Sequence, residues 1–377
     1  MRIRREDLLV PVLAVLTAML VGMIFIWITG YDAVYAYQRL FFGMTGLQWE
    51  GGLLPEWYTT PFGRTLRLAT PLIFTGLAVA VAFRAGLFNI GGQGQMALGM
   101  IVAGAVALKL DLPGALGVFQ IPLQLAMGAL AGAAWGALAG WLKAVRGAHE
   151  VITTIMLNYV AYSIGAYLVR VGGPLQLSGS TNKETASFEP GTTMPVIWRP
   201  DNFTEVHVGL LLGLVVAALV WFVLERTALG YQIRAVGFNP EAARYGGMDV
   251  ARVTVVAMAL AGGLAGLAGV GYALGDLTKL TDTSFSSVQA GFTGIAVALL
   301  GRNHPLGVVF AALLFGGLSS GGTQIQSDQA LAAGVGPKLV DVIQGCIIFF
   351  VGADAIFRSI ANRVSARGRA TPAGAPV

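Results

Sequence analysis

The chain has 377 residues, of which 55% are hydrophobic and only 11% are charged. Ordinary soluble domains carry about 25% charged residues, so this composition excludes a water-soluble globular protein and indicates a membrane protein. The net charge of +5 comes from 24 basic and 19 acidic residues that form no basic stripe, which excludes a nucleic-acid-binding protein.

Long stretches of the chain contain no charged residue. They are 8–31, 68–83, 85–108, 112–142, 151–169, 206–224, 253–275, 283–301 and 303–327. A membrane-spanning helix needs about 20 mainly apolar residues, so these stretches predict spans. A weaker tenth candidate, roughly 337–353, has Lys338 and Asp341 at its start. We therefore expect an all-α, polytopic integral membrane protein with about ten transmembrane helices, forming a single domain over 1–377.

The distribution of basic residues predicts the orientation. With ten crossings and both termini in the cytoplasm, 15 Lys and Arg residues lie inside and 9 outside, in agreement with the positive-inside rule. The first apolar run is followed by no cleavage-site pattern, so we interpret it as a retained helix. Long external connections are then expected at about 30–64 and 171–205, and a cytoplasmic tail at 354–377.

Glycine is concentrated inside apolar segments, where Gly128, Gly132, Gly136 and Gly140 recur at every fourth residue. This spacing places a smooth strip on one helix face and allows the backbone of another helix to approach closely. Two interpretations follow: static close packing, which we favour, and helices that slide during a conformational cycle.

A second group of glycines, in 86–99, lies beside amide side chains. Glycines there predict a broken or re-entrant helix, which a membrane protein tolerates where protein or a water-filled cavity covers the exposed backbone. Further polar side chains fall near one face of a helix in 149–161. These residues either line a transport path or make structural hydrogen bonds. They are Asn89, Gln93, Gln95, Thr153 and Asn158.

The connection 225–252 is polar and basic, and its residues predict a short capped helix. Asn239 suits the N-cap, Pro240 the first turn, and Gly246 or Gly247 the left-handed end. A helix this short is marginal alone in water, so its own membrane domain or a partner must hold it. We predict that this segment binds a partner protein. The residues are Asn239, Pro240, Glu241, Ala242, Ala243, Arg244, Tyr245, Gly246 and Gly247.

Several motifs together resemble one family. The pattern across 227–247 is similar to the cytoplasmic coupling loop of permeases from the branched-chain amino acid, ribose and simple-sugar class of ABC importers. The stretches GLFNIGGQGQMALG at 86–99, HEVITTIMLNYVA at 149–161 and GFTGIAVALLGRNHPLGVVFAALLFGGL at 291–318 resemble the nucleoside and simple-sugar branch. One departure is Gln93, where the family pattern usually has Glu, so a role that needs a charge there is in doubt.

The resemblance covers 65–352 and implies a transmembrane permease for nucleosides or related simple sugars. It implies three partners: a separate ABC ATPase, an external solute-binding receptor or lipoprotein, and a second permease subunit. The additional helix and connection in 1–64 resemble the larger permease of a heterodimer. The segment 239–247 would couple transport to the ATPase, and the protein would lie in the cell membrane as a multi-pass protein.

The residues leave other functions open and exclude some. Another small polar solute, a sugar or a branched-chain amino acid, fits the same permease class. A secondary transporter is a weaker alternative, because the charge-free stretches lack the mid-membrane Asp or Glu that ion coupling usually needs. The sequence contains no phosphate-binding G-x-x-x-x-G-K-[ST] motif, no spacing of metal ligands and no set of catalytic residues. We therefore expect neither enzymatic activity nor a cofactor nor a metal.

Overall fold

The computed structural model describes residues 5–48, 55–110, 112, 114–202, 204–328 and 336–352. Helices make up nearly all the regular structure in these ranges. The expected tail at 354–377 lies outside them. The helices are α1 (Arg5–Ile28), α2 (Ala33–Thr45), α3 (Thr59–Arg84), α4 (Gly92–Lys109), η1 (Gly114–Phe119), α5 (Gln120–Arg146), α6 (Glu150–Val169), α7 (Gly209–Arg226), α8 (Ala228–Phe238), α9 (Pro240–Tyr245), α10 (Val250–Gly275), α11 (Ser284–Ser287), α12 (Ala290–Leu300), α13 (Pro305–Ser327) and α14 (Gly336–Gly352).

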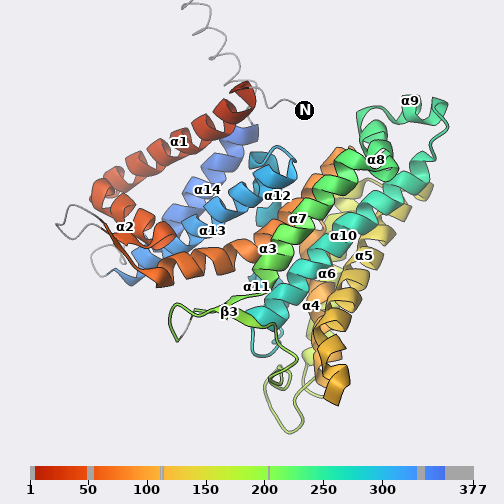
Figure 1. Ribbon diagram of the computed structural model, residues 1–377, viewed down its shortest axis with the longest axis horizontal. Coiled ribbons are helices and arrows are strands. Elements are labelled where there is room, and N and C mark those ends of the chain that lie inside the picture. Colours follow the sequence, from red (N-terminus) through yellow and green to blue (C-terminus); the bar gives the residue numbers. More distant parts are fainter. Residues whose placement is uncertain are drawn as a thin grey trace, which may run out of the picture. The chain divides into compact units, whose positions relative to one another are not determined.

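Two short antiparallel sheets lie in the connections (Figure 1). Strand β1 (Leu47–Gln48) pairs with β2 (Glu56–Trp57), and β3 (Val196–Trp198) pairs with β4 (Val206–His207). The all-α expectation is confirmed at the level of an apolar helical protein.

Within the described ranges, seven helices are both long and apolar enough to cross a membrane: α1, α3, α5, α6, α7, α10 and α13. A helix rises about 1.5 Å per residue, so each can cover most of a hydrocarbon core about 30 Å thick. Two further apolar segments, 284–300 and 339–352, are shorter. The chain is therefore a multi-pass membrane protein.

The contacts divide the chain into two compact units, and the smaller one consists of 1–39 and 322–377. In it α1 packs against α14, and Gly22 leaves room for Ile343 and the hydroxyl of Tyr37. That hydroxyl donates a hydrogen bond to the carbonyl of Met19 at 2.6 Å.

The larger unit, 40–321, is built around the contact between α5 and α10, which run side by side in Figure 1. A Cβ added at Gly132 would lie 2.2 Å from the carbonyl oxygen of Gly262, and one at Gly136 would lie 2.2 Å from that of Met258. No side chain fits between the two backbones at these positions. The glycine strip expected from the sequence is thus a close-packed helix contact.

At one end of α10, the connection between α6 and α7 covers the segment that follows α10. Backbone N–H groups of Thr185, Phe188 and Met194 donate to the carbonyls of Leu280, Thr278 and Leu274. The opposite end of α10 is preceded by α8 and α9 (Figure 1). The larger unit therefore has a covered end and an end that carries the short capped helix.

Beneath this cover lies a buried charged cluster. The carboxylate of Asp276 is 2.9 Å from Arg67 Nε and 3.8 Å from His207 Nε2. The Nδ1 atom of His207 accepts a hydrogen bond from the backbone of Gly209, so the neutral ring carries its proton on the nitrogen that faces Asp276. His207 is buried.

Candidate functional site

The connection between α7 and α10 forms the two consecutive helices α8 and α9. Thr227 caps α8 by accepting the N–H of Gly230 at 3.2 Å, and Asn239 caps α9 by accepting two backbone N–H groups at 3.0 Å each. Pro240 occupies the first turn of α9, and Gly247 follows with a φ of +80°. The short helix, its N-cap and its glycine end are confirmed.

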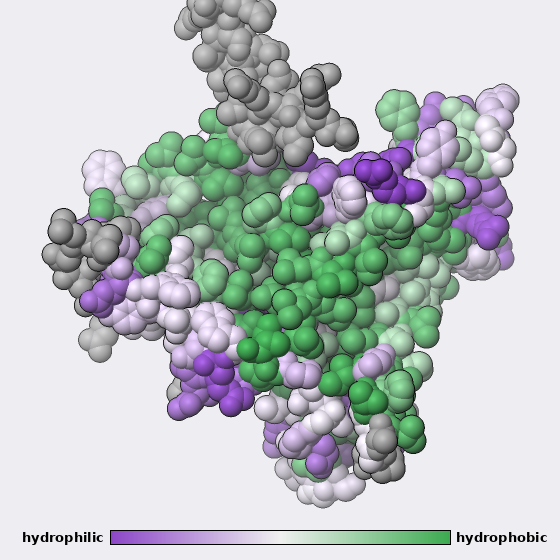
Figure 2. Space-filling model, in the orientation of Figure 1, coloured by the Kyte–Doolittle hydropathy of each residue, from purple (hydrophilic) through white to green (hydrophobic). Residues whose placement is uncertain are grey.

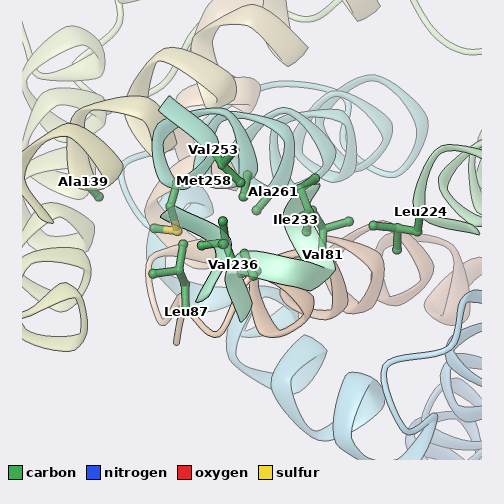
Figure 3. Packing of buried hydrophobic residues seen from close by; sticks show 13 residues of the cluster. Val81, Leu87, Ala139, Leu224, Ile233, Val236, Val253, Met258 and Ala261 are labelled. Atoms are coloured by element: carbon green, nitrogen blue, oxygen red, sulfur yellow. The ribbon is translucent and has the colours of Figure 1, made fainter. Parts of the chain in front are cut away.

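Helix α8 is held firmly by the larger unit. Ile233 and Val236 lie buried among side chains of α3 and α10 (Figure 3). A Cβ at Gly237 would lie 2.2 Å from the carbonyl oxygen of Arg84, so α8 contacts the end of α3 backbone to backbone. The carboxylate of Glu225 forms ion pairs with Arg84 at 3.5 Å and with Arg234 at 3.3 Å. This connection is therefore a supported element and not a free loop.

The residues of the 239–247 segment are of two kinds, one buried and the others exposed. Ala243 is only 4% exposed and belongs to the chain's own apolar cluster. The rest of the 239–247 segment is exposed, and Tyr245 reaches 95%. Phe238, the residue before the cap, is 94% exposed and was not among the residues we singled out from the sequence. The sequence does contain a signal for it, because an aromatic residue directly before an Asn-Pro cap in a polar connection indicates an exposed ring.

Four of the proposed path residues meet in one hydrogen-bonded layer near the start of α4. Asn89 and Gln95 exchange amide hydrogen bonds at 3.0 and 3.2 Å. Gln93 donates to the carbonyl of Val288 and accepts from Gly291. All three amide side chains are buried.

The fourth residue, Asn158, joins this layer to α6. Its amide accepts the N–H of Gly94 at 2.7 Å and donates to the carbonyl of Ile90 at 3.1 Å. The layer therefore fixes the non-helical segment 85–91 between α3 and α4, and it ties α4 to α6 and to the start of α12. Because every amide is satisfied within the chain, this geometry supports the structural interpretation of these residues.

Thr153 does not belong to the layer. It is half-buried and its hydroxyl donates to the carbonyl of His149 one turn earlier, at 3.1 Å. Its neighbour Thr154 is buried, and its hydroxyl donates to the carbonyl of Glu150 at 2.7 Å. Back-bonding of this kind satisfies a hydroxyl inside a helix without involving another element.

The outward face of α6 carries polar side chains that the sequence did not single out. Tyr159 is the tenth of the 20 residues of α6 and is 62% exposed. Its ring meets that of Tyr162 edge-on at 6.2 Å, and Ser163 is exposed next to them. Neither phenol hydroxyl has a hydrogen-bond partner among the residues that the structure describes.

The break between α11 and α12 extends this polar face. Phe285 of α11 packs against Gly165 of α6. The adjacent Ser286, Ser287 and Gln289 are exposed. The sequence pattern could not find this surface, because periodicity alone does not say which face of a mainly apolar helix points away from its own chain.

In the described part of the chain, no group of three or more His, Cys, Asp or Glu side chains is placed to hold a metal ion. The site features are thus a supported short helix at one end of the bundle, a buried amide layer, and a polar stripe on the outside of α6. A multi-pass helical protein with these features belongs to the class of membrane transport proteins.

The chain belongs to the family described as the branched-chain amino acid transport system permease component, which matches residues 62–352. It is accordingly the permease component of an ABC transport system.

Similar proteins cover nearly the whole chain. The guanosine ABC transporter permease NupP of Bacillus subtilis (strain 168) is 36% identical over 97% of this chain and 99% of its own length. The nucleoside ABC transporter permease NupB of Lactococcus lactis subsp. cremoris is 35% identical over 92% and 91%, and the glucose ABC transporter permease TsgB13 of Haloferax volcanii is 34% identical over 97% and 93%. No solved structure shows significant similarity.

Proposed function

We propose that this chain is the larger permease subunit of an ABC importer for nucleosides, which receives solute from an external receptor or lipoprotein. The observation that carries the proposal is the similarity along nearly the full length to permeases named for guanosine and nucleosides. The match to NupP extends into the residues before 62, beyond the family match. A relative named for glucose makes a sugar the second candidate solute.

The segment 239–247, together with Phe238, is the proposed contact with the ATPase. Phe238 before α9 and Tyr245 at its last residue are nearly fully exposed, and Arg244 adds an exposed side chain whose guanidinium can pair with a partner carboxylate. Exposed aromatic and Arg side chains are typical anchors of protein interfaces. Hydrolysis of ATP would take place on that partner, so we expect the purified chain to show none.

The proposed topology has ten crossings with both termini in the cytoplasm of a cell-membrane protein. Seven are the long apolar helices, and the others are α4, the broken pair α11–α12, and α14. The 15-to-9 distribution of basic residues supports this orientation. Thr185 is buried, so we expect a cysteine at the exposed position 181 of the same connection to be labelled from outside, whereas one at 240 would need permeabilised cells.

The solute path is proposed to run along the outward face of α6, where a second permease closes it. Tyrosine in membrane proteins is enriched at the bilayer surfaces, and an unpaired hydroxyl in hydrocarbon is unfavourable. Tyr159 lies halfway along α6, so protein or a hydrated path should cover it. The layer of Asn89, Gln93, Gln95 and Asn158 lies directly behind this face and would support it, with Thr153 nearer the cytoplasmic end.

Competition for uptake tests the solute. Cells that carry the whole transporter should lose labelled nucleoside uptake when unlabelled nucleosides are added, and keep it with free pentoses or branched-chain amino acids. Competition by amino acids alone would refute the nucleoside assignment but leave the permease class intact. Uptake that persists without the ATPase would instead support a secondary transporter.

Variants test the path. Tyr159→Leu should reduce the maximal rate of uptake, while Leu130→Ala, on the apolar exposed face of α5, should leave it unchanged. Equal uptake in the two variants would refute the proposed path along α6.

A further inference from the structure

The glycine strip of α5 continues toward the start of the helix as two glutamines. Gln124 precedes Gly128 by four residues, and Gln120 precedes Gln124 by another four. This spacing places all three on the same face of α5. Gln124 is 0% exposed and Gln120 3% exposed. The contact face of α5 therefore changes from glycines to a buried pair of carboxamides.

Three of the four polar atoms of this pair have no hydrogen-bond partner among the residues that the structure describes. Nε2 of Gln120 donates to the carbonyl of Leu110 at 2.9 Å. Oε1 of Gln120 and both amide atoms of Gln124 are buried and unpaired. Exchanging the oxygen and nitrogen of Gln124 would change nothing, because neither atom has a partner. Buried polar side chains are nearly always satisfied, so these amides point to a ligand.

The neighbouring side chains are apolar and cannot supply the missing hydrogen bonds. A Cβ added at Gly128 would lie 2.2 Å from Val270 of α10 and 3.7 Å from Ala103 of α4. Both helices run antiparallel to α5, so the turn that holds Gln124 lies level with the following turns of α4 and α10. Those turns carry the buried residues Ala107 and Leu274. The ligand must therefore come from outside the protein.

The position of the pair restricts what this ligand can be. Both glutamines lie within the apolar span Leu116–Arg146. Figure 2 shows hydrophobic side chains over the middle of the larger unit and hydrophilic ones toward its ends. An ion enclosed there would have no counter-charge, because both side chains are neutral. The ligand must be uncharged, small enough to be enclosed, and able to donate and accept hydrogen bonds. Water has these properties.

We propose that Gln120 and Gln124 bind buried water, with one water molecule bridging the two side chains. Side chains one helical turn apart are separated by about 5–6 Å, and two hydrogen bonds of about 2.8 Å through one oxygen span that distance. The bridging water donates to Oε1 of Gln120 and accepts from Nε2 of Gln124. A second water donates to Oε1 of Gln124, so every amide atom is satisfied.

This hydration divides the contact face of α5 into two regions. At Gly132 and Gly136 the backbones of α5 and α10 touch directly, so no water fits between them. At Gln124 the contact with α4 and α10 is completed by water. Ordered water that joins buried polar groups is a fixed part of a protein structure and is costly to remove. The two glutamines thus make the start of α5 a specific water-binding site.

A double-mutant cycle tests the bridging water. The two side chains do not bond to each other, so a shared ligand is what couples them. We expect Gln124→Met to lower the melting temperature of the purified chain in detergent by about 2–4 °C, the shift that the loss of one typical hydrogen bond produces. Gln120→Met should lower it as well, and the double variant should lose less than the sum of the two. Leu130→Met, on the exposed face of α5, should leave it unchanged.

Two results of the cycle would overturn the proposal. Without bound water, Gln124→Met would remove an unpaired amide from the interior and raise the melting temperature. Losses that simply add would show that the two side chains share no ligand.

An experimental map of the whole transporter that resolves ordered waters gives the direct reading, also if a variant does not fold. We expect a water peak about 2.6–3.2 Å from Oε1 of Gln120 and from the amide of Gln124. No peak, with the two carboxamides bonded to each other, would refute the site. Neither measurement depends on the solute, so failure here leaves the proposed transport function untouched.

Discussion

The amide layer and the coupling segment are both polar, glycine-flanked interruptions of an apolar chain, yet they are built in opposite ways. In the layer, Gln93 and Asn158 are buried and bond to groups 64 to 198 residues away in the sequence. In the coupling segment, the side chain of Asn239 is exposed and bonds to backbone groups two and three residues away. One joins distant helices, and the other shapes a surface.

Because of this difference, substitutions in the layer should change the stability of the chain, whereas substitutions in the coupling segment should change partner binding. A buried amide that loses its partner leaves an unsatisfied group, which costs about 1–3 kcal/mol. An exposed side chain that is lost changes stability by about 0.5 kcal/mol or less, so its effect must appear in binding. Stability measurements and partner binding should therefore respond to different variants.

The largest effect on stability is expected from Asn158→Leu. The change keeps the size of the side chain but leaves the N–H of Gly94 and the carbonyl of Ile90 without their partner, so we expect a loss of about 2–5 kcal/mol. Thermal unfolding of the purified chain in detergent measures it. Thr153→Val, which removes only a back-bonded hydroxyl, is the control, and equal melting temperatures would contradict the structural role of the layer.

A smaller loss is expected from Ala243→Leu. Ala243 packs inside the chain, so the larger side chain should displace α9 at a cost of about 1–3 kcal/mol. Ala242→Leu, on the neighbouring exposed position, should cost little. Hydrogen exchange of 239–248 distinguishes the two, and equal protection in both variants would mean that α9 is not held by the core.

The double change Phe238→Ser and Tyr245→Ser should leave the melting temperature unchanged and weaken ATPase association about tenfold or more, because exposed aromatic rings are frequent interface anchors. Affinity is measured with the purified ATPase subunit. Tyr231→Ser, on the exposed side of α8, serves as the matched change. Loss of affinity in that variant alone would move the proposed contact from α9 to α8.

The smallest effect is expected from Asn239→Ala, which removes the N-cap of α9 at a cost of about 1 kcal/mol. Faster hydrogen exchange confined to 239–247 would show it. Asn239→Asp keeps an acceptor at the cap and should restore protection. Identical exchange in Ala and Asp variants would mean that packing of Ala243 alone orders the helix.

The sequence was informative wherever the determining interaction is local or repetitive. Hydropathy predicted the apolar helices, the four-residue spacing of Gly128 to Gly140 predicted a close helix contact, and the Asn-Pro pair predicted the start of α9. Each of these depends on neighbours within one or two turns.

The rest depends on tertiary contacts. No pattern shows that Ala243 faces the core while Ala242 faces solvent, because both are small and adjacent. Gln93 bonds to Val288 and Gly291, which lie nearly 200 residues away in the sequence. The burial of His207 against Asp276 likewise follows from a cover that forms only when the chain between α6 and α7 folds over the end of α10.

The backbone contact between α5 and α10 has a mechanical consequence. Helix α10 runs for 26 residues, about 39 Å, from the segment after α9 to Asp276. The glycines of α10 would by themselves make this helix flexible. Because the backbone of α5 packs directly against it, the two helices should resist bending together. We expect a displacement of α9 to tilt α5 and α10 together as one rigid pair. The tilt would then move Asp276, at the far end of α10, relative to its partners Arg67 and His207.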